Sequence, residues 1–88
     1  MIELSDEMLT EISYVQISQY RTKVMKALDG EVKIPSNIAR DSGIRTNHIL
    51  KVLGELKKHE LVECINPEVR KGRLYRHTEK GVIVTENL

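Results

Sequence analysis

Apolar residues recur at helical spacing in two stretches near the start of the chain. In the first, Met8, Leu9 and Ile12 follow Ser5, a residue type that often begins a helix. The second stretch runs over about 18–28 and ends before a Gly-containing stop signal. Its apolar residues form one stripe: Tyr20, Val24, Ala27 and Leu28. The pattern therefore predicts a short amphipathic helix and then a first strong helix.

Two further helices are predicted in the middle of the chain. After the β-compatible stretch 32–34, Pro35 suits the first turn of a short helix that ends at Ser42-Gly43. A longer third helix follows over about 46–59. Its apolar residues at i, i+3, i+4 and i+7 predict a buried face: Ile49, Val52, Leu53 and Leu56. The opposite side is polar except for Leu50.

The last third of the chain has the pattern of a β-hairpin and a closing helix. Residues 61–66 and 73–77 favour strands, and the turn-rich stretch between them holds Pro67 and Gly72. Thr78-Glu79 then suits the start of a helix that runs through Val84. The mixture of helices and one hairpin predicts an α+β fold.

Length and composition limit this fold to one domain with a small core. The chain has 88 residues, of which 40% are hydrophobic, and it contains no Trp or Phe. A chain of this size buries only about 60–65% of its unfolded surface, so aliphatic side chains supply nearly all of the burial. A partner subunit would add to that core, and we therefore expect a homodimer.

The net charge of +1 is the sum of opposed blocks. Residues 1–13 hold four acidic residues and no basic one, a local charge of −4. Residues 45–59 hold four basic residues against one acidic residue, and 67–77 hold the same balance, so each carries +3. The third predicted helix and the hairpin are thus locally basic, although the whole chain is nearly neutral.

The order of elements is that of a winged helix-turn-helix, with a three-helix core, a β-hairpin wing, an extra N-terminal segment and a C-terminal helix. The sequence resembles small winged-helix transcription regulators of the ArsR and MarR type, in particular the compact archaeal ones. The resemblance covers about 18–81. It rests on ordered matching stretches: Tyr20-Arg21, Val24, Leu28, 35–39, Gly43-Ile44, Leu53, Leu56, 61–63, 72–76 and 78–81.

This resemblance implies a regulator that binds double-stranded DNA. The third helix, about 46–59, would enter the major groove, and the 67–73 wing would meet the phosphate backbone or the minor groove. Residues 1–17 would form the acidic N-terminal segment, and residues 18–88 would form the DNA-binding domain. The implied contact residues are Ser36, Asn37, Arg45, Thr46, Asn47, His48, Lys51, Arg70, Lys71 and Arg73. Arg suits bidentate contact with guanine and Asn with adenine, whereas Lys and Ser mostly position a protein on phosphate.

Other functional classes find less support in the sequence. Cys64 is the only cysteine, and the three histidines are too far apart in sequence to predict a compact metal site, so we expect no metal and no cofactor. A Cys64–His77 pair across the hairpin has no activating neighbours, and we expect no enzyme. The lack of a membrane-length apolar run and of a basic leader predicts a soluble, cytoplasmic protein.

A rival hypothesis keeps the same fold. The near-neutral net charge, the acidic N-terminal segment and Leu50 also suit a winged helix used as a protein-interaction module in a transcription or replication assembly. Leu50 could touch a thymine methyl group, pack on the wing or mark a protein-binding face, and ordinary packing is the interpretation that we favour. Arg76 could turn inward along the hairpin, so it is left out of the contact set.

Overall fold

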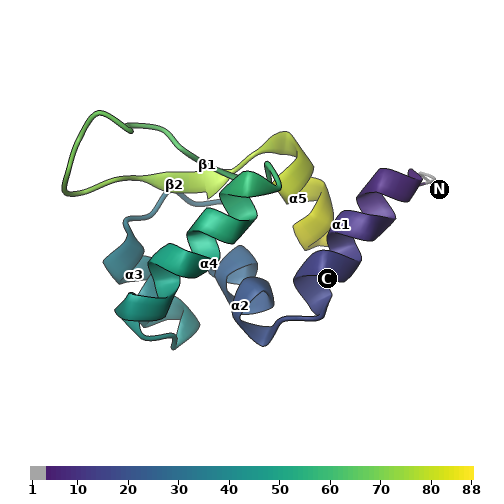
Figure 1. Ribbon diagram of the computed structural model, residues 1–88, viewed down its shortest axis with the longest axis horizontal. Helices are drawn as coiled ribbons and strands as arrows, with labels where there is room; N and C mark the ends of the chain where they lie inside the picture. Colours follow the sequence, from purple (N-terminus) through teal and green to yellow (C-terminus); the bar gives the residue numbers. More distant parts are fainter. Residues whose placement is uncertain (1–3) are drawn as a thin grey trace.

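The computed structural model describes residues 4–88 as five helices and a two-stranded hairpin. Glu3, one of the four acidic residues of the N-terminal segment, lies outside the described residues. Figure 1 shows the helices gathered beneath and beside the hairpin, which extends beyond them at one end. The elements in chain order are α1 (Asp6–Gln16), α2 (Gln19–Ala27), α3 (Pro35–Ser42), α4 (Thr46–Lys58), β1 (Val62–Cys64), β2 (Tyr75–His77) and α5 (Glu79–Glu86). Each predicted helix is therefore confirmed.

Hydroxyl side chains begin three of the helices. Ser5 accepts a hydrogen bond from Met8 N (3.2 Å), Ser18 from Arg21 N (3.2 Å) and Thr78 from Gly81 N (3.0 Å). Each bond satisfies an N–H group that has no partner within the first turn of a helix. Within residues 4–88, α3 and α4 are the two helices without such a side-chain cap.

Residues with positive φ end α3 and α4. Gly43, with φ of 73°, closes α3 and lets the chain turn directly into α4. Glu60, with φ of 59°, takes the corresponding place after α4, where Glu60 N donates to Lys57 O (2.9 Å) and Leu61 N donates to Leu56 O (2.9 Å). These two bonds form a Schellman motif around a residue that is not glycine.

The strands are shorter than the sequence predicts, with residues 62–64 pairing antiparallel with residues 75–77 rather than 61–66 with 73–77. The reason is Asn66, whose side-chain oxygen accepts from Leu74 N (2.7 Å) and whose amide donates to Gly72 O (3.1 Å). One backbone bond continues beyond the strands, from Ile65 N to Leu74 O (2.9 Å), and the side chain of Asn66 takes the place of its counterpart at Leu74 N. The β-compatible stretch 32–34 is confirmed, because Lys33 forms a bridge with Tyr75.

The core draws on all five helices and both strands. The predicted buried face of α4 is confirmed, and Ile12 and Val15 place α1 in the same core. Two residues of the predicted apolar stripes are exposed instead, namely Leu9 and Tyr20, and Met25 takes the buried position on α2. None of the helices in residues 4–88 has the length and apolar character needed to cross a membrane.

Candidate nucleic-acid interface

The outer side of α4 is polar at the N-terminal end of the helix. Arg45 occupies the N-cap position, and Thr46, Asn47 and His48 form the first turn of the helix. All four side chains are exposed, as is Lys51 one turn later. The buried face of the same helix fixes this side outward, because four apolar residues spaced along α4 pack into the core.

The basic residues on this side have no acidic partners. Among residues 4–88, the ion pairs engage Arg21, Lys33, Arg40, Arg76 and Lys80, together with His59. Nine Lys and Arg residues of this part of the chain form no ion pair. Two are on α2, namely Lys23 and Lys26. The other seven belong to the α4 region and the wing: Arg45, Lys51, Lys57, Lys58, Arg70, Lys71 and Arg73. The free positive charge is therefore concentrated on two elements.

The wing is the loop between β1 and β2, and its tip is basic. Arg70, Lys71 and Arg73 are all exposed there. Arg73 Nε donates to Val69 O (2.8 Å), so this side chain also braces the tip. Gly72, with φ of 74°, supplies the backbone conformation that the turn requires. In Figure 1 the wing extends past the end of α3, away from α1 and α5.

The start of α3 differs in part from the expectation. Ser36 is exposed, but Asn37 is half-buried. The backbone N–H of Asn37 donates to Ile34 O (3.0 Å), so it is not free to bind a phosphate. A contact from Asn37 would have to come from its side chain.

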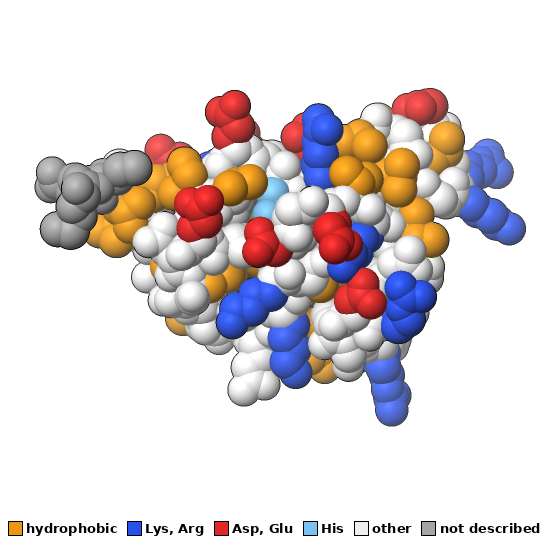
Figure 2. All heavy atoms as spheres, turned by 180° about the vertical axis from the view of Figure 1, so that it is seen from behind, with side chains coloured by type: hydrophobic (Ala, Val, Ile, Leu, Met, Phe, Trp, Pro, Cys, Tyr) orange, Lys and Arg blue, Asp and Glu red, His pale blue; other side chains and the backbone are white. Residues whose placement is uncertain are grey.

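The acidic α1 contacts the other end of α4. Lys80 Nζ lies 3.2 Å from a carboxylate oxygen of Glu7 and 3.7 Å from one of Glu11. Glu11 also lies 3.0 Å from His59 Nδ1, and the ring of His59 stacks on Tyr14 with centroids 3.7 Å apart. Figure 2, the face opposite the view of Figure 1, shows acidic and basic side chains interspersed without a large block of either.

Searches of family models and of curated proteins found no match to this chain. Solved structures do match. A homodimeric winged helix-turn-helix DNA-binding domain from Mycobacterium bovis, described as a possible ArsR-family transcriptional regulator, is 18% identical. The match covers 99% of this chain and 85% of that one, with a TM-score of 0.73.

Two further matches agree. NolR from Sinorhizobium fredii is 19% identical, with 99% of this chain and 91% of that one covered and a TM-score of 0.66. A MarR family transcriptional regulator from Silicibacter pomeroyi is 12% identical, with 93% and 61% covered and a TM-score of 0.69. The fold is a winged helix-turn-helix. At these identities the likeness establishes the fold alone. All three proteins come from bacteria, so they do not support the archaeal part of the resemblance.

In this winged helix, α3 and α4 form the helix-turn-helix pair, and the hairpin of β1 and β2 carries the wing. Leu50 is 61% exposed in the middle of the outer side of α4, so its favoured assignment to ordinary packing is wrong. Arg76 is exposed and lies 3.6 Å from Glu63 on the paired strand, so it does not turn inward.

The histidines of the winged helix have separate surroundings. His48 is exposed, His59 pairs with Glu11, and only 9% of His77 is exposed. His77 Nε2 lies 2.8 Å from Met25 O, and a carbonyl only accepts, so Nε2 carries the hydrogen. Burial lowers the pKa of His77. Nowhere in residues 4–88 do three or more His, Cys, Asp or Glu side chains converge on a point that could hold a metal ion.

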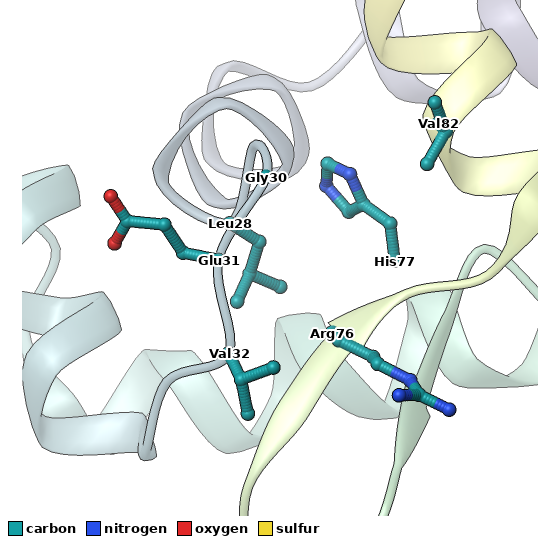
Figure 3. A pocket seen from close by; sticks show the side chains of 7 residues that line it. All are labelled: Leu28, Gly30, Glu31, Val32, Arg76, His77 and Val82. Carbon is teal, nitrogen blue, oxygen red and sulfur yellow. The ribbon is translucent and has the colours of Figure 1, made fainter.

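A shallow hollow lies beside His77. Apolar side chains line it from the segment after α2 and from α5, together with the charged residues Glu31 and Arg76. Figure 3 shows the imidazole projecting from β2 toward the turn after α2. Cys64 is half-buried and faces Tyr75 rather than His77 in the strand register. The Cys64 thiol lies 3.6 Å from Asn66 Oδ1. These positions give the thiol and the imidazole no shared site.

Proposed function

We propose that this chain is a DNA-binding transcriptional regulator that acts without enzymatic chemistry. It places α4 in the major groove of double-stranded DNA and lays the 67–73 wing on the phosphate backbone or in the minor groove. The observation that carries the proposal is the concentration of unpaired basic residues on α4 and the wing. Unpaired Lys and Arg side chains can exchange counterions for phosphates, which is the main source of affinity for duplex DNA.

The residue types suit the two tasks of such an interface. Arg45 and Asn47, exposed at the start of α4, can form bidentate contacts with guanine and adenine. Thr46 and His48 can add contacts beside them, whereas Lys51 positions the helix on phosphate. The wing residues and the start of α3 supply the remaining phosphate contacts: Arg70, Lys71, Arg73, Ser36 and Asn37. Because α4 has no side-chain cap, the N–H groups of Thr46 and Asn47 in its first turn are available to phosphate oxygens.

The regulator acts as a homodimer in this proposal. The Mycobacterium bovis domain with the same fold is described as homodimeric. Several aliphatic side chains of α1 and α5 are exposed, which a second copy of the chain could cover: Leu9, Val82 and Ile83. Two copies of α4 would then read half-sites about one helical turn apart on a pseudo-palindromic operator.

The test is a titration of labelled duplex DNA at several salt concentrations. The wild type is compared with the wing variant Arg70→Glu plus Lys71→Glu and with the control Lys23→Glu plus Lys26→Glu. The control makes the same change of charge at exposed, unpaired residues of α2. We expect a slope of log affinity against log salt of about −0.9 per phosphate contact, which becomes smaller in the wing variant and changes little in the control. No binding by the wild type at low salt would refute the proposal.

Exposed Leu50 favours a second candidate, a winged helix that docks on another protein of a transcription or replication assembly. A 61% exposed leucine at the centre of a polar helix side is a natural anchor for a protein contact. Leu50→Ala separates the two candidates. If the regulator is correct, this variant retains most of its affinity for duplex DNA and changes the sequences selected from a random pool, because Leu50 can contact only thymine methyl groups.

A further inference from the structure

A groove runs between α2 and the outer side of α4. Its volume is about 330 Å³. Tyr20 and Arg21 of α2 line it together with Ser18, the N-cap of that helix. His48, Lys51 and Glu55 line it from α4. In Figure 1, α4 crosses the molecule with the wing on one side and α2 on the other, so this groove adjoins the side of α4 opposite the wing.

Arg21 keeps the one acidic side chain of the groove occupied. Lys51 and Glu55 are four residues apart on α4, a spacing at which Lys and Glu often pair. A carboxylate oxygen of Glu55 instead lies 3.5 Å from Arg21 Nη2. Tyr14 holds Arg21 in place, because its backbone oxygen accepts a hydrogen bond from Arg21 Nη1 (3.0 Å) and its ring lies beneath the guanidinium group. Among the ion pairs of residues 4–88, none includes Lys51. Its ammonium group is therefore free to meet an anion.

Tyr20 adds a donor from the opposite wall. Its apolar neighbours on α2 are buried, but Tyr20 is 43% exposed, and its ring centroid lies 5.6 Å from that of His48. The side chains of Tyr20, His48 and Lys51 thus line one hollow, and they carry a phenol hydroxyl, an imidazole and an ammonium group. All three can donate hydrogen bonds to an oxyanion, and Tyr is among the side chains that contact DNA phosphates in protein complexes.

We propose that this groove holds a backbone phosphate of the bound duplex, with Tyr20 and Lys51 as its principal ligands and His48 beside them. This inference rests on the proposed function and extends it, because the protein would grip the backbone on both sides of α4, with the wing on one side and α2 on the other. The occupant is a duplex phosphate because His48 and Lys51 belong both to this groove and to the exposed side of α4. Arg21 acts as a positioning residue that holds Glu55 away from Lys51.

The experiment uses Tyr20→Phe and Lys51→Gln, singly and together, with Lys26→Gln as the control. Lys26 is an exposed, unpaired lysine of α2 that does not line the groove. Binding is measured to a duplex that the wild type selects from a random pool. Tyr20→Phe should weaken binding by about threefold to tenfold, the range for one lost hydrogen bond. Lys51→Gln should also reduce the salt slope by about 0.9, whereas Lys26→Gln should leave both quantities near wild type.

A scan of the same duplex locates the phosphate. Each backbone phosphate is replaced in turn by a neutral methylphosphonate. We expect one position at which this replacement weakens the wild type but has little further effect on the Tyr20→Phe, Lys51→Gln double variant. Equal thermal melting of all variants shows that they are folded.

The two levels of the inference fail differently. If the wild type binds DNA and the groove variants bind as tightly with an unchanged slope, the groove is not a phosphate site, and the proposed function survives. If the wild type binds no duplex, both are refuted.

Discussion

Two glycines within helices are predicted to respond to the same substitution with opposite signs. Gly54 lies on the outer side of α4, and a Cβ atom added there would meet nothing within 4 Å. Gly81 lies in the first turn of α5, where an added Cβ would overlap the backbone oxygen of Leu61 and approach its carbonyl carbon to 3.0 Å and His77 Cβ to 3.4 Å. Both residues have ordinary helical backbone, so their surroundings alone decide the outcome.

The magnitudes follow from these surroundings. Gly54→Ala should stabilise the protein by about 0.5–1 kcal/mol, because Ala loses less backbone freedom than Gly when a helix forms. Gly81→Ala gains the same propensity term but forces α5 away from Leu61. Overpacking of this kind costs typically about 1–3 kcal/mol and more when backbone must move, so we expect a net loss of at least about 2 kcal/mol. The displacement would also strain the bond from Thr78 N to Leu61 O (3.1 Å) that ties α5 to the hairpin.

Thermal unfolding followed by far-ultraviolet circular dichroism measures both effects at one protein concentration. In a domain of this size, 1 kcal/mol corresponds to about 4–8 °C in Tm. Gly54→Ala should therefore raise Tm by a few degrees, and Gly81→Ala should lower it by at least about 8 °C. A Gly81→Ala protein with wild-type Tm would refute the close packing of α5 on Leu61, the residue before β1. A fall in the Tm of Gly54→Ala would show that the outer side of α4 is covered in the protein as it exists in solution.

Three further predictions concern helix ends and titrating groups. Glu60→Gly should raise the free energy of unfolding by about 1 kcal/mol in urea titrations, because Gly takes positive φ without the cost that Glu bears, whereas Glu79→Gly, at negative φ, should not. Below pH 6.5 the unfolded chain binds a proton at His77 that burial disfavours in the folded state. Stability should therefore fall as pH decreases, by at most about 1.4 kcal/mol per pH unit. In a pH series of melts, the His77→Gln variant should lack this component. The hydrogen bond from Lys33 lowers the pKa of Asp41 in the folded state. The stability that this bond contributes above pH 3.8 should therefore be lost as pH falls below that value. The Asp41→Asn variant should not show this acid-dependent loss in the same series.

Local signals were sufficient to predict the helices. Ser5, Ser18 and Thr78 cap helices through hydrogen bonds within three residues, and Pro35 and Gly43 act through their own backbone preferences. Interactions of this kind depend only on residues close in sequence. The buried side of α4 was predictable for a related reason, because four residues at helical spacing leave a single orientation against the core.

Tertiary interactions decided what the sequence could not predict. Tyr20 has the spacing of a core residue, but Met25 fills the buried position on α2, and the ring turns to His48 across the groove. The strands stop early because the side chain of Asn66 binds Leu74, eight residues away. The pairing of Arg21 with Glu55 spans 34 residues and could not be read from the favourable spacing of Glu55 and Lys51. The exposure of the proposed contact residues on α4 and the wing could be predicted from the sequence. Whether each of them is free of an ion pair could not be predicted, because that depends on partners distant in sequence.

The placement of the ion pairs explains how a chain with a net charge of +1 can present a basic surface. Glu7 and Glu11 of α1 pair with Lys80 of α5, and Glu11 also contacts His59 at the C-terminal end of α4. Arg45 lies at the other end of this 13-residue helix, which at 1.5 Å per residue is about 20 Å away. The Debye length at physiological ionic strength is about 8 Å, so the charge of α1 is largely screened before it reaches the start of α4. Net charge adds all residues equally, but a phosphate at the start of α4 responds mainly to the unpaired cations within a Debye length of it.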